Sequence, residues 1–176
     1  EHYFGFDTIN WDRNLRRGFS GKLRHSVAFT PKTEVVTNQF RPVFTAHIHL
    51  DPFGISTRVL GFLWTGVERT GAGEELRGII DNAVWGDLGA YWNVDIAWRM
   101  LSIKKIVDIH INGFFDVGMV KPAEADIELD HLEYAAGLGL ALYPDFAPGT
   151  VIRFYYGFDL KRLGNGEFIF TFEEFY

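Results

Sequence analysis

One arginine and two aspartates are spaced so that they could form an ion-paired site on the polar side of a sheet. Arg77 is followed by Gly78 in a long polar stretch, and Asp95 and Asp116 lie on the polar faces of two successive predicted strands. An arginine folded against such a face needs anionic partners, because an unpaired charge away from bulk water is costly. One planar guanidinium can bridge two carboxylates. The spacing therefore predicts that Arg77 holds its loop to the sheet; the alternative is a solvated loop arginine.

Other residues of suggestive type do not add up to a catalytic or ligand-binding site. His47 and His49 share one strand face, but a third metal ligand would have to come from elsewhere. The acidic pair Glu74–Glu75 flanks a predicted turn and is interpreted as solvated. Gly71–Gly73 lacks the strand-to-helix unit and the lysine of a phosphate-binding loop. We therefore expect no enzyme activity, no catalytic residue, no bound metal and no cofactor.

The elements that would position these residues are strands, because polar and apolar residues alternate along nearly the whole chain. Around Asp95, the apolar residues Trp92, Val94 and Ile96 alternate with small or polar ones. Nine strands are predicted, at 3–11, 15–30, 37–50, 57–67, 90–103, 106–120, 132–143, 150–160 and 167–176. The expected fold class is all-β and antiparallel.

Composition narrows the class of protein. At 176 residues the chain is long enough for one domain, and its 16% aromatic and 23% charged residues suit alternating strands better than a soluble helical domain. No run reaches the roughly 18–20 apolar residues of a membrane-spanning helix, so a membrane would have to be crossed by a β-barrel. The net charge of -6 argues against a nucleic-acid partner. The absence of cysteine excludes disulfides and thiolate metal sites.

Strand length and aromatic faces favour a transmembrane β-barrel over a soluble sheet. Several predicted strands run ten or more residues, whereas soluble strands average about 5–6 and tilted membrane strands need about 9–11. The long connections at 67–89 and 121–131 contrast with short turns elsewhere, as extracellular loops do with periplasmic turns. Since bacterial barrels have even strand numbers, nine strands predict either the C-terminal part of a larger barrel of about 16 strands or a short barrel. A chain beginning at Glu1 is expected to be processed or truncated.

Motifs along the C-terminal part of the chain carry a resemblance to a known family. Arg77-Gly78 resembles the arginine-glycine motif at the tip of an inward-folded loop, and Asp95 stands at the acidic position of the following strand. The next strand, Gly113–Val120, resembles a signature strand in which the aspartate is flanked by an aromatic residue and a glycine, here Phe115 and Gly118. The last strand resembles a C-terminal targeting strand through its aromatic residues Phe168, Phe170, Phe172, Phe175 and Tyr176.

Together with the small-residue centre of Leu132–Leu140, these motifs make the last 110 or so residues similar to the C-terminal β-barrel of the outer-membrane assembly insertase and bacterial surface-antigen superfamily, which is BamA-like. Differences are Leu76 and Ile79, where valine and an aromatic residue are more usual, and Asp95, where glutamate is commoner. No polypeptide-transport repeat occurs in this sequence.

The resemblance implies a single β-barrel domain over residues 1–176 in the bacterial outer membrane, with a loop at about 67–89 folded inward. It implies a part in outer-membrane protein assembly or polypeptide translocation. The partners would be the lipid bilayer and client polypeptides, accessory subunits or a second copy of the barrel, not nucleic acid. One alternative is a barrel without insertase activity that anchors, exports or assembles with an upstream enzyme domain or a partner chain. Another is a soluble β-barrel that binds an apolar ligand.

Overall fold

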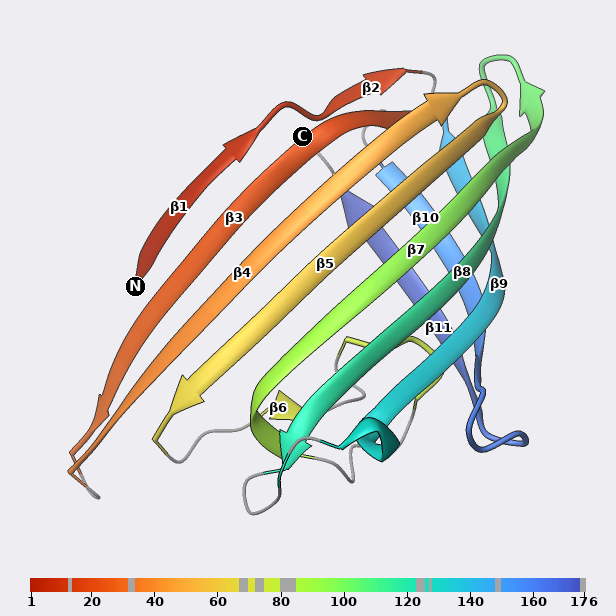
Figure 1. Ribbon diagram of the computed structural model, residues 1–176. Helices are drawn as coiled ribbons and strands as arrows, with labels where there is room; N and C mark the ends of the chain where they lie inside the picture. The colour runs from red at the N-terminus through yellow and green to blue at the C-terminus, as the bar shows by residue number, and fades with distance from the viewer. Residues whose placement is uncertain are drawn as a thin grey trace.

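The chain forms one antiparallel sheet, seen in a computed structural model (Figure 1). The structure describes residues 1–12, 14–31, 34–66, 70–71, 75–79, 85–122, 126, 128–147 and 150–174. The strands are β1 (His2–Asp7), β2 (Asn10–Asp12), β3 (Leu15–Thr30), β4 (Val35–Leu50), β5 (Phe53–Thr65), β6 (Thr70–Gly71), β7 (Trp85–Ile103), β8 (Val107–Pro122), β9 (Leu132–Pro144), β10 (Thr150–Asp159) and β11 (Gly166–Glu174). One turn of 3-10 helix, Leu129–His131, precedes β9. Within these ranges no helix combines the length and the hydropathy needed to span a membrane.

The long strands follow one another across the sheet in chain order. The order is β1-β3-β4-β5-β7-β8-β9-β10-β11, with β2 beside β3 and β6 beside β7. The sheet curls, so that β10 and β11 pass behind β5 and β7 in the view of Figure 1. No ladder joins the edge strands β1 and β11 among the described residues, so this sheet is open. The predicted all-β, antiparallel class is confirmed. The described strands do not close into the predicted barrel, because the edge strands β1 and β11 are not paired.

The predicted strands are all present. β5 begins at Phe53, four residues before its predicted start, and two other strands differ more from the prediction. The first predicted strand divides into β1 and β2 because Thr8 turns toward β3, where its N–H donates to the Phe19 carbonyl oxygen at 3.0 Å. Gly18 makes this approach possible, since a Cβ there would lie 2.5 Å from the Thr8 oxygen. The second difference is that β7 begins at Trp85, inside the predicted loop at 67–89. That loop also contributes the two residues of β6.

The two faces of the sheet differ in chemical character. On the inner face of β8 Asp108, His110, Asn112 and Asp116 are buried, and this face surrounds an open cavity of about 760 Å³ lined by residues from β3 to β11. We call this cavity the lumen. The outer face exposes large apolar side chains, among them Phe19, Val27, Phe44, Ile48, Val59, Trp92, Ile96, Trp98, Phe115, Phe158, Phe168, Phe170 and Phe172. Water-soluble proteins bury most such side chains and expose most charged ones, so the usual distribution is reversed over much of this sheet.

Candidate functional site

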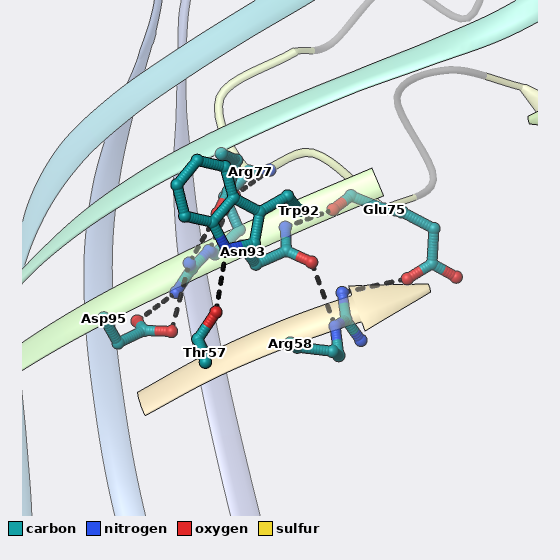
Figure 2. Close-up of polar contacts among 8 residues, drawn as sticks. Thr57, Arg58, Glu75, Arg77, Trp92, Asn93 and Asp95 are labelled. Atoms are coloured by element: carbon teal, nitrogen blue, oxygen red, sulfur yellow. Dashed lines mark hydrogen bonds and ion pairs between the residues drawn. The ribbon is translucent and has the colours of Figure 1, made fainter. Parts of the chain in front are cut away.

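A short loop segment, residues 75–79, lies against the inner face between strands that are distant in sequence. Its side chains and main chain contact β4 and β5 through Glu75, β7 and β8 through Arg77, and β10 through Gly78. Figure 2 shows Glu75 extending from this segment toward Arg58 and Arg77 extending toward Asp95, on two neighbouring strands. We call Arg77, Gly78, Asp95 and Asp116 the Arg77 site.

The structure brings Arg77 into contact with both predicted carboxylates. Its Nη1–H donates to Asp95 Oδ1 at 2.5 Å and its Nη2–H to Asp95 Oδ2 at 3.3 Å. Toward Asp116, Nε–H donates to Oδ2 at 2.9 Å and Nη2–H to Oδ1 at 2.7 Å. The guanidinium thus binds two carboxylates through paired hydrogen bonds, a geometry that lysine could not reproduce.

Asp116 is the more buried of the two partners and also binds the loop main chain. Its side chain is 0% exposed, against 33% for Asp95, and its Oδ2 accepts a hydrogen bond from the Arg77 main-chain N–H at 3.0 Å. Burial acts to lower the pKa of Arg77, but the hydrogen bonds and charges of Asp116 and Asp95 outweigh it and raise that pKa above its ordinary value. Arg77 therefore stays charged at physiological pH, which keeps both ion pairs intact.

Two aromatic rings complete the surroundings of the Arg77 guanidinium. Its Cζ lies 4.0 Å from the ring centroid of Phe114 and 5.7 Å from that of Tyr155, within the roughly 6 Å over which cation–π attraction acts. Each ring lies across a glycine of β9. A Cβ on Gly137 would lie 2.5 Å from the Phe114 ring, and one on Gly139 would lie 2.3 Å from the Tyr155 ring. The small-residue centre of β9 therefore makes room for the rings that contact Arg77.

Gly78 brings the loop backbone into direct contact with the backbone of β10. Its φ is +88°, a conformation that favours glycine. A Cβ on Gly78 would lie 2.6 Å from the carbonyl carbon of Gly157, and a Cβ on Gly157 would lie 2.7 Å from the Gly78 Cα. Both positions must therefore lack a side chain. Gly157 is a site residue that the sequence did not reveal, since only its place on the polar face of β10 could be read from alternation.

Apolar contacts on either side of Arg77 anchor the same segment. Leu76 and Ile79 are 1% and 3% exposed and pack in a cluster with Leu60, Phe62, Tyr91, Val120 and Ala135. Gly118 of the predicted signature strand leaves space for this packing. A Cβ on Gly118 would lie 2.3 Å from the Tyr91 ring and 3.1 Å from Leu76. Leu76 and Ile79, which differ from the usual residues of the superfamily that the sequence resembles, are therefore buried anchors of the loop.

The interpretation of Glu75 as a solvated residue is wrong. Its side chain is 10% exposed and forms ion pairs with Arg41 and Arg58, the latter at 3.0 Å. Alternation along the strands could not have shown this, because both partners are distant in sequence and belong to strands that precede the loop. Its neighbour Glu74 lies outside the described residues.

The other predicted site residues lie away from the Arg77 site. Phe115 points to the outer face, where it is 40% exposed. Phe168, Phe170 and Phe172 lie on the outer face of the edge strand β11 and are 57–64% exposed. The last two predicted residues of the targeting strand, Phe175 and Tyr176, lie outside the described residues.

A second ion-paired cluster lies at the end of β10, where the sequence alone did not indicate one. Arg162 donates from Nε to Asp159 Oδ2 at 2.6 Å and from Nη2 to Glu133 Oε2 at 3.1 Å. Lys161 adds a contact from Nζ to Glu133 Oε1 at 3.3 Å. Like Arg77, Arg162 is bound to two carboxylates, but it holds the turn after β10 and not the loop.

The two histidines on β4 have separate partners in the wall. His47 Nδ1 lies 2.7 Å from Ser56 Oγ, and His49 Nδ1 lies 3.3 Å from the carboxylate of Asp12. In the part of the chain that the structure describes, no group of three or more His, Cys, Asp or Glu side chains is placed to hold a metal ion.

Comparison with known proteins does not assign this chain to a family. No protein-family model matches it, and no curated protein matches its sequence. The contacts of the loop and the chemical character of the two faces are therefore the observations from which a function can be argued.

Proposed function

We propose that this chain is an outer-membrane β-barrel domain of the insertase and translocation superfamily, with a part in outer-membrane protein assembly or polypeptide translocation in a bacterium. The observation that carries the proposal is the ion pairing of Arg77 with Asp95 and Asp116 on the inner face. It supports the resemblance because it joins three motifs, one in a loop and two in strands, in a single contact. An arginine in a solvated surface loop would not contact a fully buried carboxylate such as Asp116.

The outer face supports a location in lipid. Aromatic and aliphatic side chains cover it along every long strand, and each gains roughly 1.5–3 kcal/mol on leaving water for an apolar medium. β3, β4 and β8 have 16 residues each, more than the 9–11 or so that cross a bilayer at a tilt. Contact with lipid chains would therefore be more favourable for this apolar face than contact with water.

In this proposal, residues 75–79 stay inside the lumen and stabilise the wall that β7, β8 and β10 form around them. Arg77→Ala would leave Asp116 buried without its cation, and breaking such a pair costs about 3–5 kcal/mol. We expect the loop to leave the wall and the activity to fall. The bilayer, client polypeptides and accessory subunits or a second copy are the proposed partners.

The test uses the full-length protein in its host. Arg77→Ala should increase protease cleavage within the loop and lower the amounts of other barrel proteins in the outer membrane. Arg162→Ala is the matched control, since it also removes an arginine bound to two carboxylates, and it should change neither measurement. Normal barrel-protein amounts in Arg77→Ala, or release of the protein into the aqueous fraction without detergent, would contradict the proposal.

A further inference from the structure

The charges of the loop are opposite in sign to those of the wall that each of them faces, which fixes the direction in which the loop crosses the wall. Along the loop, the anion Glu75 comes two residues before the cation Arg77. The wall opposite Glu75 is cationic, with Arg41 on β4 and Arg58 on β5. The wall opposite Arg77 is anionic, with its carboxylates on β7 and β8. A loop that slid or reversed would place like charges together, which is unfavourable at every contact.

Glu75 belongs to a closed ring of hydrogen bonds that includes its own main chain (Figure 2). Arg58 Nη2–H donates to Glu75 Oε2 at 3.0 Å, and Arg58 Nε–H donates to Asn93 Oδ1 at 3.0 Å. Asn93 Nδ2–H then donates to the Glu75 main-chain oxygen at 3.0 Å. Asn93 is 4% exposed. The ring thus fixes both the side chain and the backbone of Glu75 against β5 and β7.

Strand register connects this ring to the Arg77 site. Asn93 is paired with Arg58 across the β5–β7 ladder and with Asp116 across the β7–β8 ladder. The three side chains therefore form a row across the inner face, and the loop crosses it. The Arg77 N–H reaches Asp116 at 3.0 Å only if the loop backbone crosses β7 at the right place. That place is set two residues earlier, where Asn93 holds the Glu75 carbonyl group.

We propose that Glu75 is a positioning residue for Arg77. Bound to Arg58 and Asn93, it fixes the path of the loop and so aligns the main-chain and guanidinium N–H groups of Arg77 with Asp116. The inference rests on the proposed function in taking the lumenal loop as the working part of the barrel. Glu75 does not touch Arg77, so its effect must pass through the loop backbone.

The test measures hydrogen exchange of the Arg77 Nε–H by NMR, in the full-length protein in detergent micelles. Glu75→Gln keeps the shape of the side chain but removes its charge and replaces one of its two acceptor oxygens by a donor, so Arg41 and Arg58 no longer each have a carboxylate oxygen to bind. A hydrogen bond to a charged group is worth enough that exchange at Arg77 should become about 10-fold faster. Glu133→Gln is the matched control, because Glu133 is equally buried and also binds two cations, Lys161 and Arg162. Exchange at Arg77 should not change in that variant.

Unchanged exchange at Arg77 in Glu75→Gln, or an equal change in Glu133→Gln, would overturn the inference. If Glu75→Gln does not fold, Arg58→Gln breaks the same ring from the wall and must give the same acceleration. Failure of the proposed function has a different signature. Arg77→Ala would then leave barrel assembly normal, while Glu75→Gln could still accelerate exchange at Arg77.

Discussion

Alanine at position 78 should release the loop from the inner face, because Gly78 occupies a place that no side chain fits. A φ of +88° costs a residue with a Cβ about 1–2 kcal/mol. The added Cβ would lie 2.6 Å from the carbonyl carbon of Gly157, and relieving an overlap in a packed site costs about 1–3 kcal/mol. Gly78→Ala therefore weakens binding of the loop by about 2–5 kcal/mol, and the released population should rise at least about 30-fold.

Thiol labelling can measure that population. The chain has no cysteine, so Leu76→Cys provides a single thiol at a position that is 1% exposed. A maleimide reaches it only when the loop leaves the wall, and the labelling rate follows the released population when rebinding is fast. Equal labelling rates with and without Gly78→Ala would refute the reasoning.

Two further variants test the overlap and control for a general loss of stability. Gly157→Ala creates the overlap without a positive φ, since its Cβ would lie 2.7 Å from the Gly78 Cα, and it should raise labelling at least about 5-fold. Gly164→Ala places a Cβ at a positive φ of +123° in the turn between β10 and β11, where no atom lies within 4 Å of it. It should leave labelling of the loop unchanged. An effect of Gly164→Ala as large as that of Gly78→Ala would show that the labelling follows general destabilisation and not the contact with β10.

Two further predictions concern the wall. Asp116 is wholly buried and accepts hydrogen bonds from three N–H groups, so Asp116→Asn should lower the free energy of unfolding in urea by about 2–3 kcal/mol. Asp95 is part-exposed, so Asp95→Asn should lower it by less than about 1 kcal/mol. Equal losses in the two variants would contradict this ranking. Gly137→Ala, whose Cβ would lie 2.2 Å from the Tyr156 main-chain oxygen and 2.5 Å from the Phe114 ring, should cost about 1–3 kcal/mol in the same measurement. Gly113→Ala is its control, since its nearest contact is at 3.7 Å, and an equal loss there would show that these close contacts are not the cause.

The strands and their faces could be predicted because alternation is a local property of the chain. Polar and apolar residues alternate along β8, so Asp116 could be assigned to the inner face from its position in the strand, without knowing which side chains lie near it in space. Asp95 follows in the same way from β7. With both carboxylates on adjacent strands, the sequence predicted that Arg77, in the loop before β7, binds them. Facing alone left a solvated loop arginine as an equal alternative, and the resemblance favoured the ion pairing that the structure contains.

The path of the loop could not be predicted, because it depends on contacts between distant parts of the chain. Nothing near Glu75 in sequence indicates Arg41 as a partner, and nothing near Gly78 indicates Gly157. Both contacts arise from the curl of the sheet, which brings β4 and β10 to the same segment. The break at Thr8 has a similar cause, since it depends on how closely Gly18 lets β3 approach.

The contact between Gly78 and Gly157 has a consequence for the order of folding. The loop precedes β8, β9 and β10 in the chain, so its partners Asp116 and Gly157 lie far from Arg77 and Gly78 in sequence. Contacts between such distant residues form late, because the long intervening chain must first be ordered. Firm binding of residues 75–79 therefore requires β10 to be already paired in the sheet. Binding of the loop would therefore stabilise only those chains in which the last strands have already paired in the correct register.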